Sequence, residues 1–145
     1  MASSLLVAGT TSDAGKTVVV TALCRAFARR GLKVAPFKAQ NMSNNSMVVS
    51  GHHAAGPAGS ASTGTAEIGR AQWIQALAAR AVPEPAMNPV LLKPGGDRRS
   101  HVVVMGQPAG SVSSRDFVDG RTHLAQAAFA AYDDLASRYD LVICE

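Results

Sequence analysis

The sequence predicts an α/β protein of three layers, in which helices cover both faces of a mostly parallel β-sheet. Short apolar runs typical of buried parallel strands alternate with stretches of helical periodicity. A glycine-containing loop joins the first apolar run to the first helix. The 145 residues are 47% hydrophobic and 17% charged, which is typical of one globular domain and not of a disordered chain.

The first predicted elements are a strand, a loop and a helix. Residues 4–8 (SLLVA) form an apolar run that stops before a glycine, and residues 15–31 repeat apolar side chains at helical spacing. The loop between them, GTTSDAGKT at residues 9–17, has five residues between its glycines, whereas the pattern G-x-x-x-x-G-K-[ST] has four. We therefore predict a P-loop variant with Thr10 in place of the first glycine.

The remaining elements continue the alternation. Residues 32–38 predict a second strand, residues 66–81 a helix and residues 140–145 a last strand. Residues 40–66 lack periodicity and predict a long loop with a Gly-, Ala- and Ser-rich second half. Between the second helix and the last strand we expect two short apolar segments, NPVLLKP and SHVVVMG, and a long helix within RDFVDGRTHLAQAAFAAYDDLASRY. Because the chain stops at a strand tip, we expect the domain to be truncated at its C-terminus.

Composition argues against several kinds of partner. No apolar run approaches the length of a bilayer span, and no basic region precedes the first apolar run, so we expect a soluble cytoplasmic protein without a membrane partner. The net charge is +4, but the basic residues are scattered, so we expect no nucleic-acid partner. Cys24 and Cys144 lack metal-ligand spacing and are interpreted as small buried hydrophobes. Whether copies associate as a homo-oligomer stays open.

The predicted P-loop indicates a site for ATP and Mg²⁺, since it follows a strand and opens a helix. Its backbone amides would surround phosphate oxygens, Lys16 would bridge the outer phosphates, and the Thr17 hydroxyl would hold Mg²⁺. Asp13 would repel polyphosphate and receives no phosphate role. An ordinary strand-to-helix turn is the alternative. The predicted nucleotide-binding residues are Thr11, Ser12, Ala14, Gly15, Lys16, Thr17 and Val18.

Five segments resemble the N-terminal domain of the cobyric acid synthase family, the glutamine-dependent amidases of cobalamin biosynthesis. They are GTTSDAGKT, VAPFKAQNMSNNS, EIGRAQ, MNPVLLKP and DLVICE, and they extend over nearly the whole chain. The family belongs to the dethiobiotin synthetase-like P-loop superfamily. The resemblance implies an ATP-dependent ligase that amidates four peripheral carboxylates of adenosylcobyrinic acid a,c-diamide, a corrinoid, through an acyl phosphate. Residues 1–145 would be its incomplete ATP-binding domain, and a C-terminal amidotransferase domain, absent here, would supply ammonia from glutamine.

The sequence departs from the family pattern at residues 50–65, SGHHAAGPAGSASTGT, which resemble an insertion between NMS and EIGRAQ. The loop on the substrate side is therefore expected to be longer than in the family.

The other site residues are expected near strand ends, where open α/β sheets bind ligands. Lys38 would be a second catalytic cation, with a solvated lysine as the alternative. Glu145 would hold Mg²⁺ like the acid of a Walker B element. Glu67, at the predicted start of a helix, matches the acidic metal ligand of the related synthetases; a first-turn glutamate stabilised by the helix dipole is the alternative. The predicted substrate-binding residues are Lys38, Gln40, Asn41 and Ser43, for which a solvated loop is the alternative.

Two other functions stay open. A related carboxylate-activating synthetase, of the dethiobiotin or the cobyrinic acid a,c-diamide type, would share the acyl-phosphate chemistry; QNMSNNS and MNPVLLKP argue against the dethiobiotin type. A partitioning-type P-loop switch ATPase would carry a signature lysine at the start of its loop. This chain has Gly9, Thr10 and Thr11 there, which argues against the switch.

Overall fold

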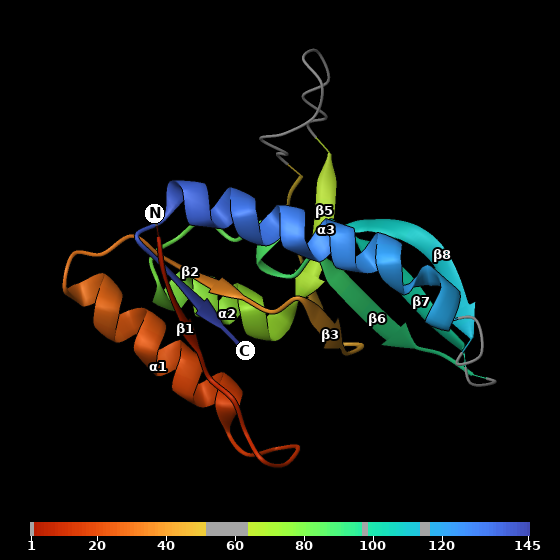
Figure 1. Ribbon diagram of the computed structural model, residues 1–145, viewed down its shortest axis with the longest axis horizontal. Coiled ribbons are helices and arrows are strands. Elements are labelled where there is room, and N and C mark those ends of the chain that lie inside the picture. Colours follow the sequence, from red (N-terminus) through yellow and green to blue (C-terminus); the bar gives the residue numbers. More distant parts are fainter. Residues whose placement is uncertain (1, 52–63, 97–98, 114–116) are drawn as a thin grey trace.

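A computed structural model describes residues 2–51, 64–96, 99–113 and 117–145 (Figure 1). The elements in chain order are β1 (Ser3–Leu6), α1 (Lys16–Arg29), β2 (Val34–Phe37), β3 (Gln40–Met42), β4 (Ser46–Ser50), β5 (Thr65–Gly69), α2 (Arg70–Ala78), the 3₁₀ helix η1 (Pro85–Met87), β6 (Val90–Pro94), β7 (Arg99–Val104), β8 (Gln107–Ser113), α3 (Phe117–Arg138) and β9 (Leu141–Cys144).

The core sheet has three parallel strands in the order β1-β9-β2. Because side chains alternate along a strand, each strand serves both faces of the sheet. On one face Val34, Leu141 and Ile143 pack with side chains of α1, and on the other Phe37 and Val142 pack with side chains of α3. Figure 1 shows α1 and α3 on opposite sides of these strands. The predicted α/β fold, with helices on both faces of a parallel sheet, is confirmed.

Two further sheets, of four and two strands, lie beside the core sheet. Strand β3 runs parallel to β6, which continues through antiparallel pairs to β7 and β8, and β4 pairs antiparallel with β5. The prediction of a loop from residue 40 is therefore wrong for residues 40–42 and 46–50. The polar residues of β3 have low strand propensity, but pairing with the distant β6 overrides it. Val48 and Val49 of β4 do favour a strand, which pairs with β5. Residues 52–63 of the predicted insertion lie outside the described residues.

The predicted helix over residues 66–81 begins later than expected, at Arg70. The preceding residues form β5, in which Ile68 lies opposite Met47 of β4 and the Glu67 amide donates to the Gly106 carbonyl. The prediction that Glu67 opens a helix is therefore wrong, because Glu67 pairs with β4 as part of strand β5. The helix dipole cannot be what favours a glutamate at this position.

Cys24 lies on the buried face of α1, which confirms its interpretation as a buried hydrophobe. Its side chain is fully buried, and burial raises the pKa of the thiol to about 12, so the thiol stays protonated at neutral pH. Cys144 is half-buried and its pKa is raised by the same cause. Within the described residues, no helix combines the length and the apolar character needed to cross a bilayer.

Candidate functional site

The loop of residues 9–15 leads into the N-terminus of α1. Gly15 caps the helix with φ +83°, in the left-handed region that glycine adopts at little cost. Gly15 has no side chain that could accept from the first-turn amides of α1, as a capping serine or aspartate would. Amides at a helix N-terminus attract anions, and the loop has the geometry expected of a phosphate site.

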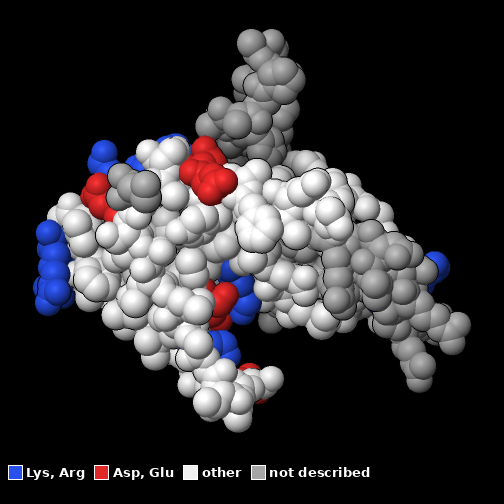
Figure 2. All heavy atoms as spheres, in the orientation of Figure 1, with Lys and Arg blue, Asp and Glu red and all other residues white. Residues whose placement is uncertain are grey.

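A cavity of about 370 Å³ joins this loop to the ends of the core strands. Figure 2 shows a hollow on this face of the molecule in which basic and acidic atoms lie together. The cavity is lined by Ser12, Asp13, Ala14, Gly15, Lys16, Thr17, Lys38, Asn41, Met42 and Glu145. Eight residues predicted from the sequence therefore meet at one place.

Five predicted site residues do not line this cavity. The carbonyl of Thr11 accepts a hydrogen bond of 3.4 Å from Lys16 Nζ, so Thr11 still contacts the loop lysine. Val18 is exposed and lines an apolar groove between α1 and α2 instead. Gln40 is exposed, and the Ser43 hydroxyl accepts from the Asn45 amide. The Glu67 carboxylate accepts hydrogen bonds from Ser46 and Lys93, which do not line the cavity.

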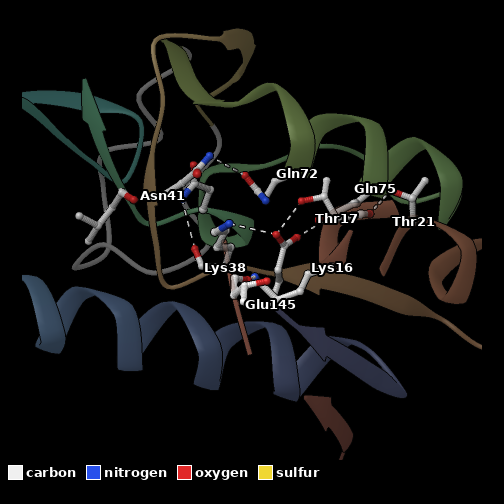
Figure 3. A network of polar contacts seen from close by, with 11 residues as sticks. Lys16, Thr17, Thr21, Lys38, Asn41, Gln72, Gln75 and Glu145 are labelled. Carbon is white, nitrogen blue, oxygen red and sulfur yellow. Dashed lines mark hydrogen bonds and ion pairs between the residues drawn. The ribbon is translucent and has the colours of Figure 1, made fainter. Parts of the chain in front are cut away.

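Glu145 is the centre of a polar network behind the cavity (Figure 3). Its Oε1 accepts from Thr17 Oγ1 at 2.7 Å and from Lys38 Nζ at 3.0 Å, and its Oε2 accepts from Gln75 Nε2 at 2.8 Å. The Glu145 side chain is only 2% exposed, whereas Lys38 is 24% exposed. These contacts tie α1, the end of β2 and α2 to one carboxylate at the end of β9.

The network keeps Glu145 ionised although it is buried. Burial by itself would raise the pKa of this carboxyl group, but the hydrogen bonds from Thr17, Gln75 and Lys38, with the charge of Lys38, outweigh burial and hold the pKa below its ordinary value. A carboxylate oxygen thus lies beside the Thr17 hydroxyl at the edge of the phosphate site. Hard oxygen donors of this kind, few in number, are what Mg²⁺ takes from proteins.

Glu67 belongs to a second cluster. Its Oε1 accepts from the Ser46 hydroxyl and from Lys93 Nζ, in partly exposed surroundings. Burial would raise the pKa of Glu67, but the hydrogen bonds from Lys93 and Ser46 lower it further than burial raises it. Among the residues that the structure describes, no three His, Cys, Asp or Glu side chains form a group that could hold a metal ion.

Sequence reasoning missed the glutamines of α2. Gln72 and Gln75 are fully buried, whereas Ile74 and Leu77 of the same helix are exposed. The buried side of α2 therefore includes two amides as well as apolar side chains such as Ala76. Gln72 Oε1 accepts from Asn41 Nδ2 at 3.1 Å, so both glutamines contact residues of the cavity (Figure 3). The signal in the sequence was a pair of amides three residues apart, which places them on one helix face.

The chain is similar to a family of nucleotide-binding domains and to proteins named cobyric acid synthase. Residues 5–127 match the family described as the CobQ/CobB/MinD/ParA nucleotide binding domain. The chain is 68% identical over 143 residues to the cobyric acid synthase of Mycolicibacterium vanbaalenii, covering 99% of this chain and 27% of that protein. It is 63% identical over 141 residues to the cobyric acid synthase of Mycobacterium marinum, covering 97% of this chain and 27% of that protein.

The chain thus spans about a quarter (27%) of the length of these curated relatives. No solved structure matches it. The predicted resemblance to cobyric acid synthases is confirmed, and the chain belongs to the CobQ/CobB/MinD/ParA nucleotide binding domain family.

Proposed function

We propose that this chain is the ATP-binding part of a cobyric acid synthase that amidates peripheral carboxylates of adenosylcobyrinic acid a,c-diamide. The observation that carries the proposal is the meeting of Lys16, Thr17, Lys38 and Glu145 around one cavity. The identity of 63% to 68% with proteins named cobyric acid synthase supports the choice of acceptor. In this proposal a further domain of the full protein supplies ammonia from glutamine, and the protein works in the cytoplasm.

The nucleotide end of the cavity is the P-loop. Amides of residues 12–17 would surround the phosphates of ATP, with Lys16 neutralising their charge. Thr17 and Glu145 offer adjacent oxygen donors for Mg²⁺ and are the residues that would hold it. When bound there, Mg²⁺ would neutralise charge on the phosphates. Glu67 as a further ligand stays a prediction, since it would first have to release Ser46 and Lys93.

The acceptor end of the cavity is formed by Lys38, Asn41 and Met42. A carboxylate is already a nucleophile at neutral pH, so it needs a position and a neighbouring cation and no general base. Lys38 supplies the cation and the Asn41 side chain supplies an amide for hydrogen bonding. Gln40 and Ser43, just outside the cavity lining, would contact more distant groups of a substrate as wide as a corrinoid.

The chemistry then follows in two steps that balance. A substrate carboxylate oxygen bonds to the terminal phosphorus of ATP while the bond to the bridging oxygen breaks, giving an acyl phosphate and ADP. Ammonia attacks the acyl carbon, phosphate leaves and one proton is released with the amide. In the first step two anions meet at about 4 Å, which costs roughly 4 kcal/mol at an effective dielectric near 20. The cations Lys16 and Lys38, which both line the cavity, would offset that cost.

The test is amidation by the full-length protein. Incubation with ATP, Mg²⁺, glutamine and adenosylcobyrinic acid a,c-diamide is expected to change the corrinoid mass stepwise, as each carboxyl hydroxyl is replaced by an amide nitrogen. Lys16→Ala is expected to abolish turnover with the fold intact. Retained turnover in this variant would contradict the phosphate role of Lys16.

The same assay, repeated with other acceptors, separates the alternatives. No change in corrinoid mass together with nucleotide-driven dimerisation would favour a partitioning-type switch. Amidation of cobyrinic acid itself, or carboxylation of a diamine, would favour a related synthetase.

A further inference from the structure

Helix α2 carries two buried glutamines behind the cavity, and neither has a role in the chemistry proposed above. Gln72 and Gln75 are three residues apart and therefore share one face of the helix. Both are fully buried, and neither lines the cavity. Figure 3 shows their side chains pointing from α2 toward the residues of the site.

Gln75 donates to the Glu145 oxygen that neither Thr17 nor Lys38 contacts. Oε1 of Glu145 is shared by Thr17 and Lys38, and Oε2 accepts from Gln75 Nε2 at 2.8 Å. The same Nε2 lies 3.5 Å from the carbonyl of Thr17, in the first turn of α1. With both carboxylate oxygens engaged from different sides, the plane of the carboxylate is fixed and Oε1 stays beside the Thr17 hydroxyl.

Gln72 has the corresponding contact at the acceptor end. Its Oε1 accepts from Asn41 Nδ2 at 3.1 Å, and Asn41 lines the cavity. The space around this bond is closed by Gly69, where a Cβ would lie 2.3 Å from Asn41 Nδ2 and 2.7 Å from Gln72 Oε1. Asn88 Oδ1 accepts from the Gly69 amide at 2.9 Å and holds that backbone in place.

Packing alone does not favour glutamine at either position. Gln72 Nε2 and Gln75 Oε1 are buried and, within the described part of the chain, have no hydrogen-bond partner. A buried polar atom without a partner destabilises the fold, whereas a methionine or leucine would fill a similar volume without that cost. Each glutamine thus leaves one polar atom unpartnered while its other polar atom contacts a site residue.

We propose that α2 positions both halves of the site, with Gln75 orienting Glu145 at the nucleotide end and Gln72 orienting Asn41 at the acceptor end. Both are positioning residues, because they act through another side chain. What each end binds rests on the proposed function, but the two contacts themselves do not. The proposal predicts that the two glutamines have separable effects although they share one helix, one face and full burial.

The test compares Gln75→Met with Gln72→Met in the full-length protein, so that each variant is the matched control of the other. Affinity for a non-hydrolysable ATP analogue is measured by calorimetry with excess Mg²⁺ and again with EDTA. Gln75→Met is expected to weaken the Mg²⁺-dependent affinity by about tenfold or more, as outer-shell substitutions at metal sites do, and to leave the affinity in EDTA unchanged. Gln72→Met is expected to leave both affinities unchanged and to raise the KM for the corrinoid by roughly fivefold, the effect of one lost hydrogen bond.

A double-mutant cycle checks that Gln75 acts through Glu145. In a Glu145→Gln background, Gln75→Met is expected to have no further effect on Mg²⁺-dependent affinity. Additive effects, or equal effects of both methionine variants on both measurements, would overturn the proposal. Gln75→Asn is a second variant that keeps the amide but withdraws it from Oε2. Misfolding of both Gln75 variants beside a folded Gln72→Met would assign Gln75 to stability alone.

The binding measurement needs no turnover, so the positioning role of Gln75 and the proposed function can fail separately. If the corrinoid is not amidated but Gln75→Met still weakens Mg²⁺-dependent binding, the proposed acceptor is wrong and the role of Gln75 stands. If amidation occurs and Gln75→Met binds Mg²⁺ and nucleotide normally, the positioning role is wrong and the proposed function stands.

Discussion

Glu145 and Glu67 are held by the same kinds of partner in two different settings. Each carboxylate accepts one hydrogen bond from a hydroxyl group and one from a lysine. Glu145 follows a parallel strand of the core sheet and is 2% exposed, whereas Glu67 lies within an antiparallel strand pair and is 27% exposed. The buried carboxylate also has a third donor, Gln75.

A carboxylate that contacts a lysine and a hydroxyl group is therefore not by itself the mark of the candidate site. Parallel strands end at one edge of a sheet, and Glu145 is placed there beside the P-loop. Burial strengthens each of its charge interactions, because less water screens them. Topology and burial, more than the identity of the partners, therefore distinguish the two clusters.

The largest effect is expected from Glu145→Gln. This variant removes the charge that Thr17, Lys38 and Gln75 surround, so amidation by the full-length protein should fall by at least about a hundredfold, the size typical of a lost electrostatic contact in a site. The measurement is kcat/KM for the corrinoid at saturating ATP. Glu84→Gln, which removes an acid paired with Arg138 away from the cavity, is the control. A loss within tenfold of that control would mean that Glu145 has no special role.

A smaller effect is expected from Glu67→Gln. If Glu67 joins the metal ion, it must first leave Ser46 and Lys93, so its contribution is partly offset by those lost contacts. We expect Mg²⁺-dependent nucleotide affinity to fall by about tenfold, the lower end of the range for residues near a metal. Calorimetry with Mg²⁺ and with EDTA measures it. Unchanged affinity would leave Glu67 as a structural partner of Lys93 only.

General rules for α/β sheets and P-loops were enough to select the P-loop, Glu145 and Lys38 from the sequence. The P-loop is a local pattern between a strand and a helix, and Glu145 follows from the rule that ligands bind at the ends of parallel strands. Lys38 follows from the same rule. All three lie at the cavity, and the roles assigned to them stay predictions.

The acceptor side depends on long-range pairing that local patterns do not contain. Strands β3 and β4 are short, and their partners lie further along the chain in β6 and β5. Because of the pairing between β4 and β5, Glu67 lies in a strand and not in the predicted helix. The burial of Gln75 was missed for a related reason. Its side chain donates to Glu145, which lies 70 residues further along the chain.

The pH dependence of the free energy of unfolding is a further way to compare the two carboxylates. The pKa of each lies below its ordinary value in the folded protein, so the unfolded chain binds more protons on acidification. Each contribution to stability is complete above about pH 4.3, the ordinary pKa of glutamate, and is lost as pH falls through the lower pKa of the folded state. The free energy of unfolding of Glu145→Gln is therefore expected to depend less on pH in this acid range than that of the wild type.

Glu67→Gln should flatten the same curve less, since water screens a carboxylate that is 27% exposed. Denaturant unfolding over a series of acid pH values, without nucleotide or Mg²⁺, measures both variants. A flatter curve for Glu67→Gln than for Glu145→Gln would reverse the ranking of the two sites.

The smallest effects are expected from the two hydroxyl groups, compared as Thr17→Val and Ser46→Ala. Thr17→Val keeps the side-chain volume but takes a donor from a carboxylate that water reaches poorly, and should lower the free energy of unfolding by about 1–3 kcal/mol. Ser46→Ala should cost less than about 1 kcal/mol, because Lys93 remains and water can replace the hydroxyl at Glu67. Equal costs in denaturant unfolding without ligands would mean that burial does not separate the two clusters. A larger cost for Thr17→Val would show that the hydroxyl proposed to hold Mg²⁺ is already held in place by the fold before any ligand binds.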